Sequence, residues 1–137
     1  MKGVNWAGVV VAAVVVWLVG YVWYDMLFGA AWLREMHMTE EQAMAGGMTP
    51  LFLGALNTLV MCLGLGLLVP RLGDGLMAGV KAGLLGGIFF AATNQWQGAI
   101  YGGDSNTLLM IDVGYILVGY AVGGAIIGAL RFGKKSA

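Results

Sequence analysis

The sequence GVNWAGVVVAAVVVWLVGYVWY, residues 3–24, contains no Asp, Glu, Lys or Arg. An α-helix rises 1.5 Å per residue, so about 20 apolar residues cross the hydrocarbon of a bilayer. Further charge-free stretches of this kind occupy residues 42–70, 82–103 and 113–130. We therefore predict an all-α bundle of four transmembrane helices, which forms a single integral membrane domain over residues 1–137. The predicted helices are about 4–28, 49–69, 75–98 and 107–131.

The overall composition agrees with membrane insertion and excludes other classes. Of the 137 residues, 60% are hydrophobic and 10% are charged, whereas about 25% are charged in a soluble domain. The formal net charge is zero, so no basic surface is available to bind nucleic acid. A single cysteine, Cys62, forms neither an internal disulfide nor a cysteine-based zinc site. We expect a non-enzymatic protein without a cofactor, with the lipid bilayer as its first partner.

Basic residues predict the orientation, because positively charged loops stay in the cytoplasm. Four spans place both termini on one side of the membrane. On that side the prediction places Lys2, Arg71, Lys81, Arg131, Lys134 and Lys135, with Asp74 as the one acid. Arg34 is the one basic residue predicted on the opposite side. The sequence therefore predicts an inner-membrane protein with cytoplasmic N and C termini.

Residues 29–48 separate the first two spans and carry a helical pattern of their own. Phe28, Trp32, Leu33 and Met36 recur at helical spacing, which predicts a short amphipathic helix lying on the outer membrane surface. A second short helix is predicted to begin at Thr39, with Gln42 completing a capping box.

The same segment contains the only histidine, His37, between Met36 and Met38. Thioether and imidazole ligands can bind Cu(I), so these residues form a candidate copper site. Methionine is also a common filler of interfacial helices. We expect no metal at this position.

Glycine recurs every four residues in the predicted third helix, and it recurs again in the fourth. Small residues at this spacing let membrane helices approach closely. The positions are Gly75, Gly79, Gly83, Gly87, Gly119 and Gly123. Two interpretations are open, namely packing within the bundle and the interface of a homo-oligomer.

Polar side chains from all four predicted helices lie at a similar depth, near the outer side. They are Tyr24, Asp25, Asn57, Asn94, Gln97, Asp112 and Tyr115. Asn94 and Gln97 share one face of the third helix, and Asp112 and Tyr115 share one face of the fourth. These groups could bond to one another and tie the helix ends together, could form a binding pocket for a solute or ion, or could support catalysis. Catalysis is the weakest interpretation, because no nucleophile or histidine is predicted at this depth.

Two stretches resemble a known family. The segment GYVWYDMLFGAAWLREMHMTEEQ, residues 20–42, and the segment IDVGYILVGYAVGGAIIGAL, residues 111–130, are similar to small bacterial membrane proteins called domain of unknown function 1761. The resemblance implies a four-span bundle and emphasises Trp23, Tyr24, Asp112 and Tyr115. Asp25 departs from the Ser-Pro expected there, and His37 departs from an expected glycine.

Two functional hypotheses follow. The first is a self-associating, non-enzymatic membrane protein with a polar solute-binding or ion-binding pocket in the outer leaflet, with transport as one use for it. The alternative is an accessory or structural subunit of a larger membrane complex, in which the glycine-rich faces dock against a partner membrane protein.

Overall fold

The computed structural model describes residues 3–130, which form helices and turns without a strand. The elements are α1 (Trp6–Tyr21), η1 (Val22–Leu27), α2 (Gly29–Glu35), α3 (Glu40–Met44), α4 (Thr49–Leu72), α5 (Gly75–Gly86), η2 (Gly87–Ala92), α6 (Thr93–Gly102) and α7 (Asn106–Ala129). Continuous helices over Trp6–Leu27, Thr49–Leu72, Gly75–Gly102 and Asn106–Ala129 are long and apolar enough to cross a membrane. The predicted fold class, a bundle of four membrane-spanning helices, is confirmed.

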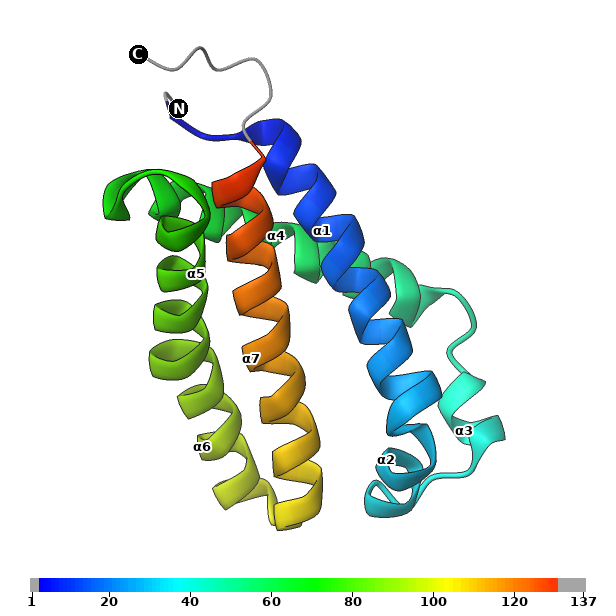
Figure 1. Cartoon of the computed structure of the whole chain (residues 1–137). Coiled ribbons are helices and arrows are strands. Elements are labelled where there is room, and N and C mark those ends of the chain that lie inside the picture. The colour runs from blue at the N-terminus through cyan, green and yellow to red at the C-terminus, as the bar shows by residue number, and fades with distance from the viewer. Residues whose placement is uncertain (1–2, 131–137) are drawn as a thin grey trace.

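The bundle has two distinct ends, which we call the terminal end, where α1 begins and α7 ends, and the loop end, where the first and third spans end (Figure 1). At the terminal end, the Asn5 side chain caps α1 by accepting from Gly8 N at 3.0 Å and donates to the carbonyl of Ile127 at 3.0 Å. It also donates to the carbonyl of Leu130. The loop end carries α2, α3 and the turn between α6 and α7. Lys2, Arg131, Lys134 and Lys135 lie outside the described residues.

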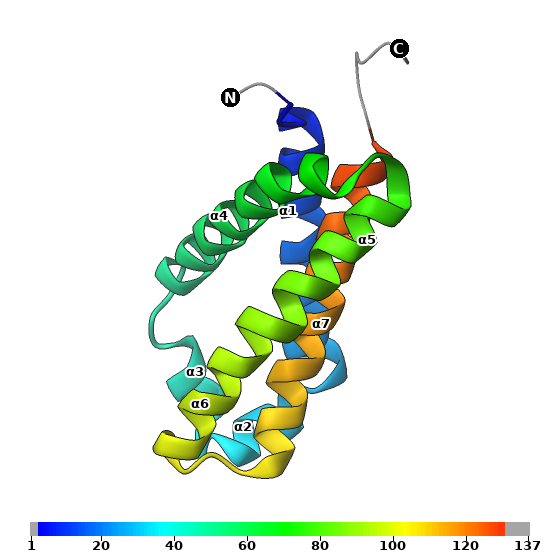
Figure 2. The ribbon, with the colours of Figure 1, turned by 90° about the vertical axis from the view of Figure 1, so that its left-hand side faces the viewer.

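Helices α5 and α7 lie side by side in both views (Figures 1 and 2), and glycines make this approach possible. A Cβ atom at Gly79 would overlap the carbonyl of Gly124, and one at Gly83 would overlap the carbonyl of Tyr120. The reciprocal position, Gly124, would overlap the carbonyl of Gly79. The predicted glycine row therefore packs inside the chain along these positions.

The other glycines of the two predicted rows have mixed environments. Gly87 meets the Tyr120 side chain, while Gly119 and Gly123 meet Val16 from α1. Gly75 has open space at its own Cβ position, although its carbonyl lies against Gly128. All except Gly75 are buried within the single chain.

The hydrophobic core lies toward the terminal end, where α1, α4, α5 and α7 meet. It contains Val9, Ala12, Ala13, Val16, Cys62, Leu65, Val69, Ala78, Ala82 and Ile127. Most of these side chains are small, which keeps the helix axes close together. From this core α4 runs obliquely toward the loop end, away from α5, α6 and α7 (Figures 1 and 2).

The first and third spans each contain a π-helical segment, η1 and η2. Such segments are uncommon and occur often at functional sites. Near the end of η2, the Thr93 hydroxyl donates to the carbonyl of Phe89 at 2.8 Å. η1 ends the first span at the loop end, whereas η2 lies across the middle of the third span.

The connection between the first two spans forms a helix ending and a helix cap, and its local sequence favours the cap. Thr39 and Gln42 form the predicted capping box at the start of α3. His37 adopts φ +54° after α2, while Met38 N donates to Leu33 O at 3.0 Å. This is a Schellman ending, whose left-handed residue is normally glycine. His37 therefore adopts a backbone conformation that costs a non-glycine residue free energy.

Candidate functional site

A cavity of about 700 Å³ lies between the four spans toward the loop end. It is lined by Val16, Tyr24, Asn57, Thr58, Val60, Met61, Phe90, Ala91, Asn94, Gln95, Asp112, Tyr115, Ile116, Gly119 and Tyr120. The first half of α4 forms one wall, and α7 with the η2 and α6 segments forms the facing walls. The oblique course of α4 is therefore what opens the cavity.

Asp112 on α7 is the acid of this cavity. The Tyr24 hydroxyl donates to its Oδ1 atom at 2.6 Å, and the Gln95 amide donates to its Oδ2 atom at 3.2 Å. Each oxygen thus accepts one neutral donor. No lysine, arginine or histidine is among the lining residues. The carboxylate is therefore oriented by its neighbours without having its charge balanced by a basic side chain.

Two tyrosines of the cavity lining lie beside Asp112. The rings of Tyr24 and Tyr115 meet edge to face, with centroids 5.2 Å apart at an interplanar angle of 71°. The Tyr115 hydroxyl donates to the carbonyl of Val16 at 3.4 Å. A Cβ at Gly20 would lie 2.8 Å from that hydroxyl oxygen, so glycine leaves the space that the phenol fills.

Trp23 anchors the end of the first span against the start of α7. Its indole nitrogen donates to the carbonyl of Ile111 at 3.0 Å, and its ring packs on Phe28 at a centroid distance of 4.8 Å. A Cβ at Gly114 would lie 2.8 Å from the Trp23 ring. The two segments that carry the family resemblance therefore bind each other: Trp23 fits over Gly114, and Tyr24 bonds to Asp112.

A comparison with protein families covers the residues that make these contacts. The family described as "Protein of unknown function (DUF1761)" matches residues 7–128, which include both segments. The chain belongs to the DUF1761 family. No curated protein and no solved structure matches it. The resemblance inferred from the sequence is therefore confirmed, and the structure adds the contacts that its motif residues make.

In this DUF1761 protein, the predicted polar residues separate into two groups. Tyr24, Asn57, Asn94, Asp112 and Tyr115 line the cavity. Asp25 and Gln97 do not line it and are exposed. Asp25 directly follows Tyr24, and consecutive residues on a helix point in different directions. Because Tyr24 faces Asp112, Asp25 faces away.

Gln95, which the sequence places at the same depth as Asn94 and Gln97, also lines the cavity and binds Asp112, although it was not among the predicted site residues. The glycine row does not predict this contact. Gly79, Gly83 and Gly87 recur every four residues, and the same interval continues through Ala91 to Gln95. In a regular α-helix of 3.6 residues per turn, such a row turns by about 40° at each step, so Gly79 and Gln95 would not share a face. The π-helical segment η2, Gly87–Ala92, interrupts the regular helix before Gln95 and changes this rotation.

The amides of Asn57 and Asn94 face the cavity from opposite walls. Both residues are exposed, and the hydrogen bonds found in residues 3–130 include none from their side chains. An amide at membrane depth without a partner is costly, so these groups need water or a polar guest.

The other candidate sites are weaker. Met36, His37 and Met38 follow one another at the end of α2, and Met36 and His37 are exposed. Within residues 3–130 no group of three or more His, Cys, Asp and Glu residues gathers to hold a metal ion. A second groove of about 540 Å³ between η2, α6 and α7 is almost entirely apolar, with Trp96 and Leu117 in its lining. It offers no polar group comparable to Asp112.

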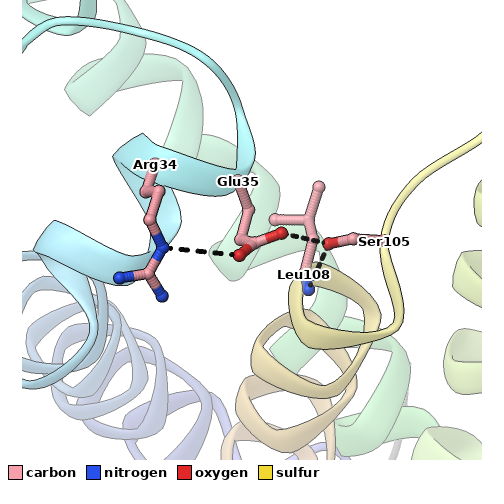
Figure 3. Close-up of polar contacts among 4 residues, drawn as sticks. All are labelled: Arg34, Glu35, Ser105 and Leu108. Atoms are coloured by element: carbon pink, nitrogen blue, oxygen red, sulfur yellow. Dashed lines mark hydrogen bonds and ion pairs between the residues drawn. The ribbon is translucent and has the colours of Figure 1, made fainter.

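At the loop end, a polar clasp joins α2 to the start of α7 (Figure 3). Ser105 caps α7 by accepting from Leu108 N at 3.1 Å, and its hydroxyl donates to Glu35 Oε2 at 2.5 Å. Arg34 Nε lies 3.6 Å from Glu35 Oε1. The hydrogen bond from Ser105 is the main cause that lowers the pKa of the Glu35 carboxyl below its ordinary value, and the contact with Arg34 lowers it further. The clasp fixes α2 beside the helix that carries Asp112.

Proposed function

We propose that this protein is a non-enzymatic, multi-pass inner-membrane protein whose cavity binds a small polar or charged solute from the outer leaflet. The observation that carries the proposal is Asp112, an acid at membrane depth in a cavity lined by all four spans without a basic side chain. Ionisable groups inside membrane proteins mark substrate and ion pathways. The free amides of Asn57 and Asn94 add polar contacts for a guest.

The distribution of charge supports the orientation. Arg71 and Lys81 lie toward the terminal end, where α4 ends and α5 begins. At the loop end, Asp25, Glu35, Glu40, Glu41 and Asp104 accompany a single basic residue, Arg34. Basic residues stay on the cytoplasmic side, so the terminal end faces the cytoplasm and the cavity lies in the outer leaflet.

Cysteine labelling tests whether water enters the cavity. In a Cys62→Ala background, Asn57→Cys places a thiol on the cavity wall, and the matched control Leu56→Cys places one on the next residue, which is exposed but does not line the cavity. A membrane-impermeant maleimide added outside should label Asn57→Cys at least about tenfold faster, because reaction requires a thiolate and apolar surroundings suppress its formation. Equal rates, or labelling from the cytoplasmic side alone, would overturn the proposal.

A second candidate function is an accessory subunit in a membrane complex. The observation that favours it is Phe90, which lines the polar cavity and is nevertheless 74% exposed. A helix from a partner protein or from a second copy of this chain could cover such an exposed apolar side chain. Native mass spectrometry of protein released gently from its own membrane distinguishes the two functions. A bound small molecule favours the solute site, whereas one fixed protein partner favours the subunit.

A further inference from the structure

We infer that the cavity selects organic cations, meaning a positively charged ammonium or phosphonium centre carried on an apolar body. This inference rests on the proposed function, because it specifies which solute the same cavity takes. It follows from the charge of the lining, from its apolar and aromatic walls, and from its volume.

The charge of the lining favours a cation over an anion. Asp112 is the one acidic residue among the lining side chains, and no basic residue balances it. Tyr24 and Gln95 donate to its two oxygens but carry no charge. An uncompensated carboxylate in a medium of low dielectric constant attracts a positive charge and repels a negative one. Asp112 therefore has no positively charged partner among the lining residues, and a cationic ligand supplies one.

Aromatic rings reinforce this preference. Tyr24 and Tyr115 lie beside Asp112, and Phe90 and Tyr120 line the cavity farther away. The face of an aromatic ring attracts cations, by about 0.5–1 kcal/mol at exposed sites and by more when the pair is shielded from water. A quaternary centre needs no hydrogen bond, so these faces serve it better than they serve a hydrated metal ion.

The size and walls of the cavity favour a cation with an apolar body. A volume of about 700 Å³ is in the range of pockets that hold drug-sized ligands, about 300–1,000 Å³. Val60, Met61 and Ile116 add aliphatic surface to the aromatic rings. A single carboxylate supplies too few charged ligands for a bare divalent ion. An amphiphilic cation matches both the charge and the walls.

The exposure of one lining residue suits such a ligand. Phe90 lines the cavity yet is 74% exposed. An apolar side chain that is both exposed and part of the lining lets an amphiphile enter from the lipid without first passing through water. The charged centre then meets Asp112 inside.

Equilibrium dialysis of the purified full chain in neutral detergent tests the inference with tetraphenylphosphonium. The control ligand is tetraphenylborate, which has nearly the same shape and the opposite charge. Asp112→Asn should bind tetraphenylphosphonium at least about tenfold more weakly. The attraction between two unit charges a few ångströms apart, at an effective dielectric constant of about 20, is larger than the free energy that corresponds to a tenfold change in affinity. Asp112→Glu should retain binding, and the control Asp25→Asn should bind like the parent protein, since Asp25 is exposed and outside the cavity.

A second variant keeps the inference testable if Asp112→Asn does not fold. Asn94→Lys adds a positive charge at an exposed position on the cavity wall. It should abolish tetraphenylphosphonium binding and increase tetraphenylborate binding. Equal binding of the two ions by the parent protein, or phosphonium binding unaffected by both substitutions, would overturn the inference. If Asn57→Cys is labelled while phosphonium does not bind, the solute cavity remains supported and its selectivity for organic cations is wrong. If neither occurs, both proposals fail.

Discussion

The terminal end and the loop end of this bundle are built from the same four helices but pack in opposite ways. At the terminal end, α5 and α7 approach until backbone meets backbone, and small side chains such as Ala12 and Ala82 are completely buried. At the loop end, α4 leaves the other helices, and tyrosine, asparagine and aspartate surround a cavity. Tight packing at one end therefore positions the wider half, where polar groups can be held at defined distances.

The two ends also differ in what holds them together. Contacts at the terminal end are mainly van der Waals contacts between glycine, alanine and valine. Contacts at the loop end depend on individual pairs, such as Trp23 with Ile111, Tyr24 with Asp112, and Ser105 with Glu35. Substitutions at the terminal end should therefore cost more than substitutions of single pairs at the loop end.

The largest expected effect is at the α5–α7 contact. Gly83→Ala places a methyl group on the Tyr120 carbonyl, and forcing extra volume into a packed contact costs about 1–3 kcal/mol. We expect a corresponding loss in the free energy of unfolding, measured by titration from mild detergent into dodecyl sulfate. The matched control, Gly64→Ala, points into open space and should not lower the free energy of unfolding, because alanine is favoured over glycine inside a helix. A neutral result for Gly83→Ala would mean that α5 and α7 separate easily, and the contrast between the two ends would then be wrong.

An intermediate effect is expected at the Tyr24 pair. Tyr24→Phe removes the hydroxyl that donates to Asp112 Oδ1 at 2.6 Å. Side-chain hydrogen bonds in membrane proteins contribute about 0.6 kcal/mol on average and about 1.7 at most. The same unfolding titration should show a loss in this range, and the loss should shrink when Asp112→Asn is already present. Tyr101→Phe is the control, because Tyr101 is 85% exposed. Equal losses in both backgrounds would show that the pair is not coupled.

The smallest effect is expected at Glu35, in the polar clasp that joins α2 to the start of α7. Because its pKa lies below the ordinary value of 4.5 in the folded state, the carboxylate stabilises docking of α2 above about pH 4.5, and this contribution is lost as the pH falls through the lowered value. The protection factors of the α2 amides, which correct hydrogen exchange for the pH dependence of its intrinsic rate, should therefore fall on acidification below about pH 4.5. Glu35→Gln should remove this response, whereas the exposed control Glu40→Gln should retain it. An identical acid response in Glu35→Gln would assign the effect to another group.

Much of the fold could be predicted from the sequence, because bilayer thickness fixes the length of a charge-free helix. The four spans and the Thr39–Gln42 capping box are properties of local sequence. The oblique course of α4 is not, since an apolar stretch sets length and leaves tilt to packing. The π-helical segments η1 and η2 also left no recognisable pattern in the residues.

The sequence predicted how deep the site residues lie in the membrane, but it predicted less well which side of each helix faces the cavity. Counting from the charged ends places Asp112, Tyr115, Asn57 and Asn94 at one level, and these residues do line one cavity. Depth does not determine which side of a helix faces inward, so Asp25 and Gln97 were included and Gln95 was not. Adjacent residues point in different directions, so Tyr24 and Asp25 cannot both face the cavity. The contact of Gln95 with Asp112 follows the π-helical segment η2, which the sequence does not reveal.

Because α4 crosses its neighbours obliquely, its 24 residues, about 36 Å of helix, cover a thinner slab of lipid than an upright helix of the same length. Leu51, Phe52 and Leu53 near its start are all exposed, as expected for side chains that contact lipid. A helix longer than the hydrocarbon thickness of about 30 Å fits the bilayer by tilting. We therefore expect the slant of α4 to match its apolar length to the bilayer, and membranes with longer acyl chains to favour a more upright α4.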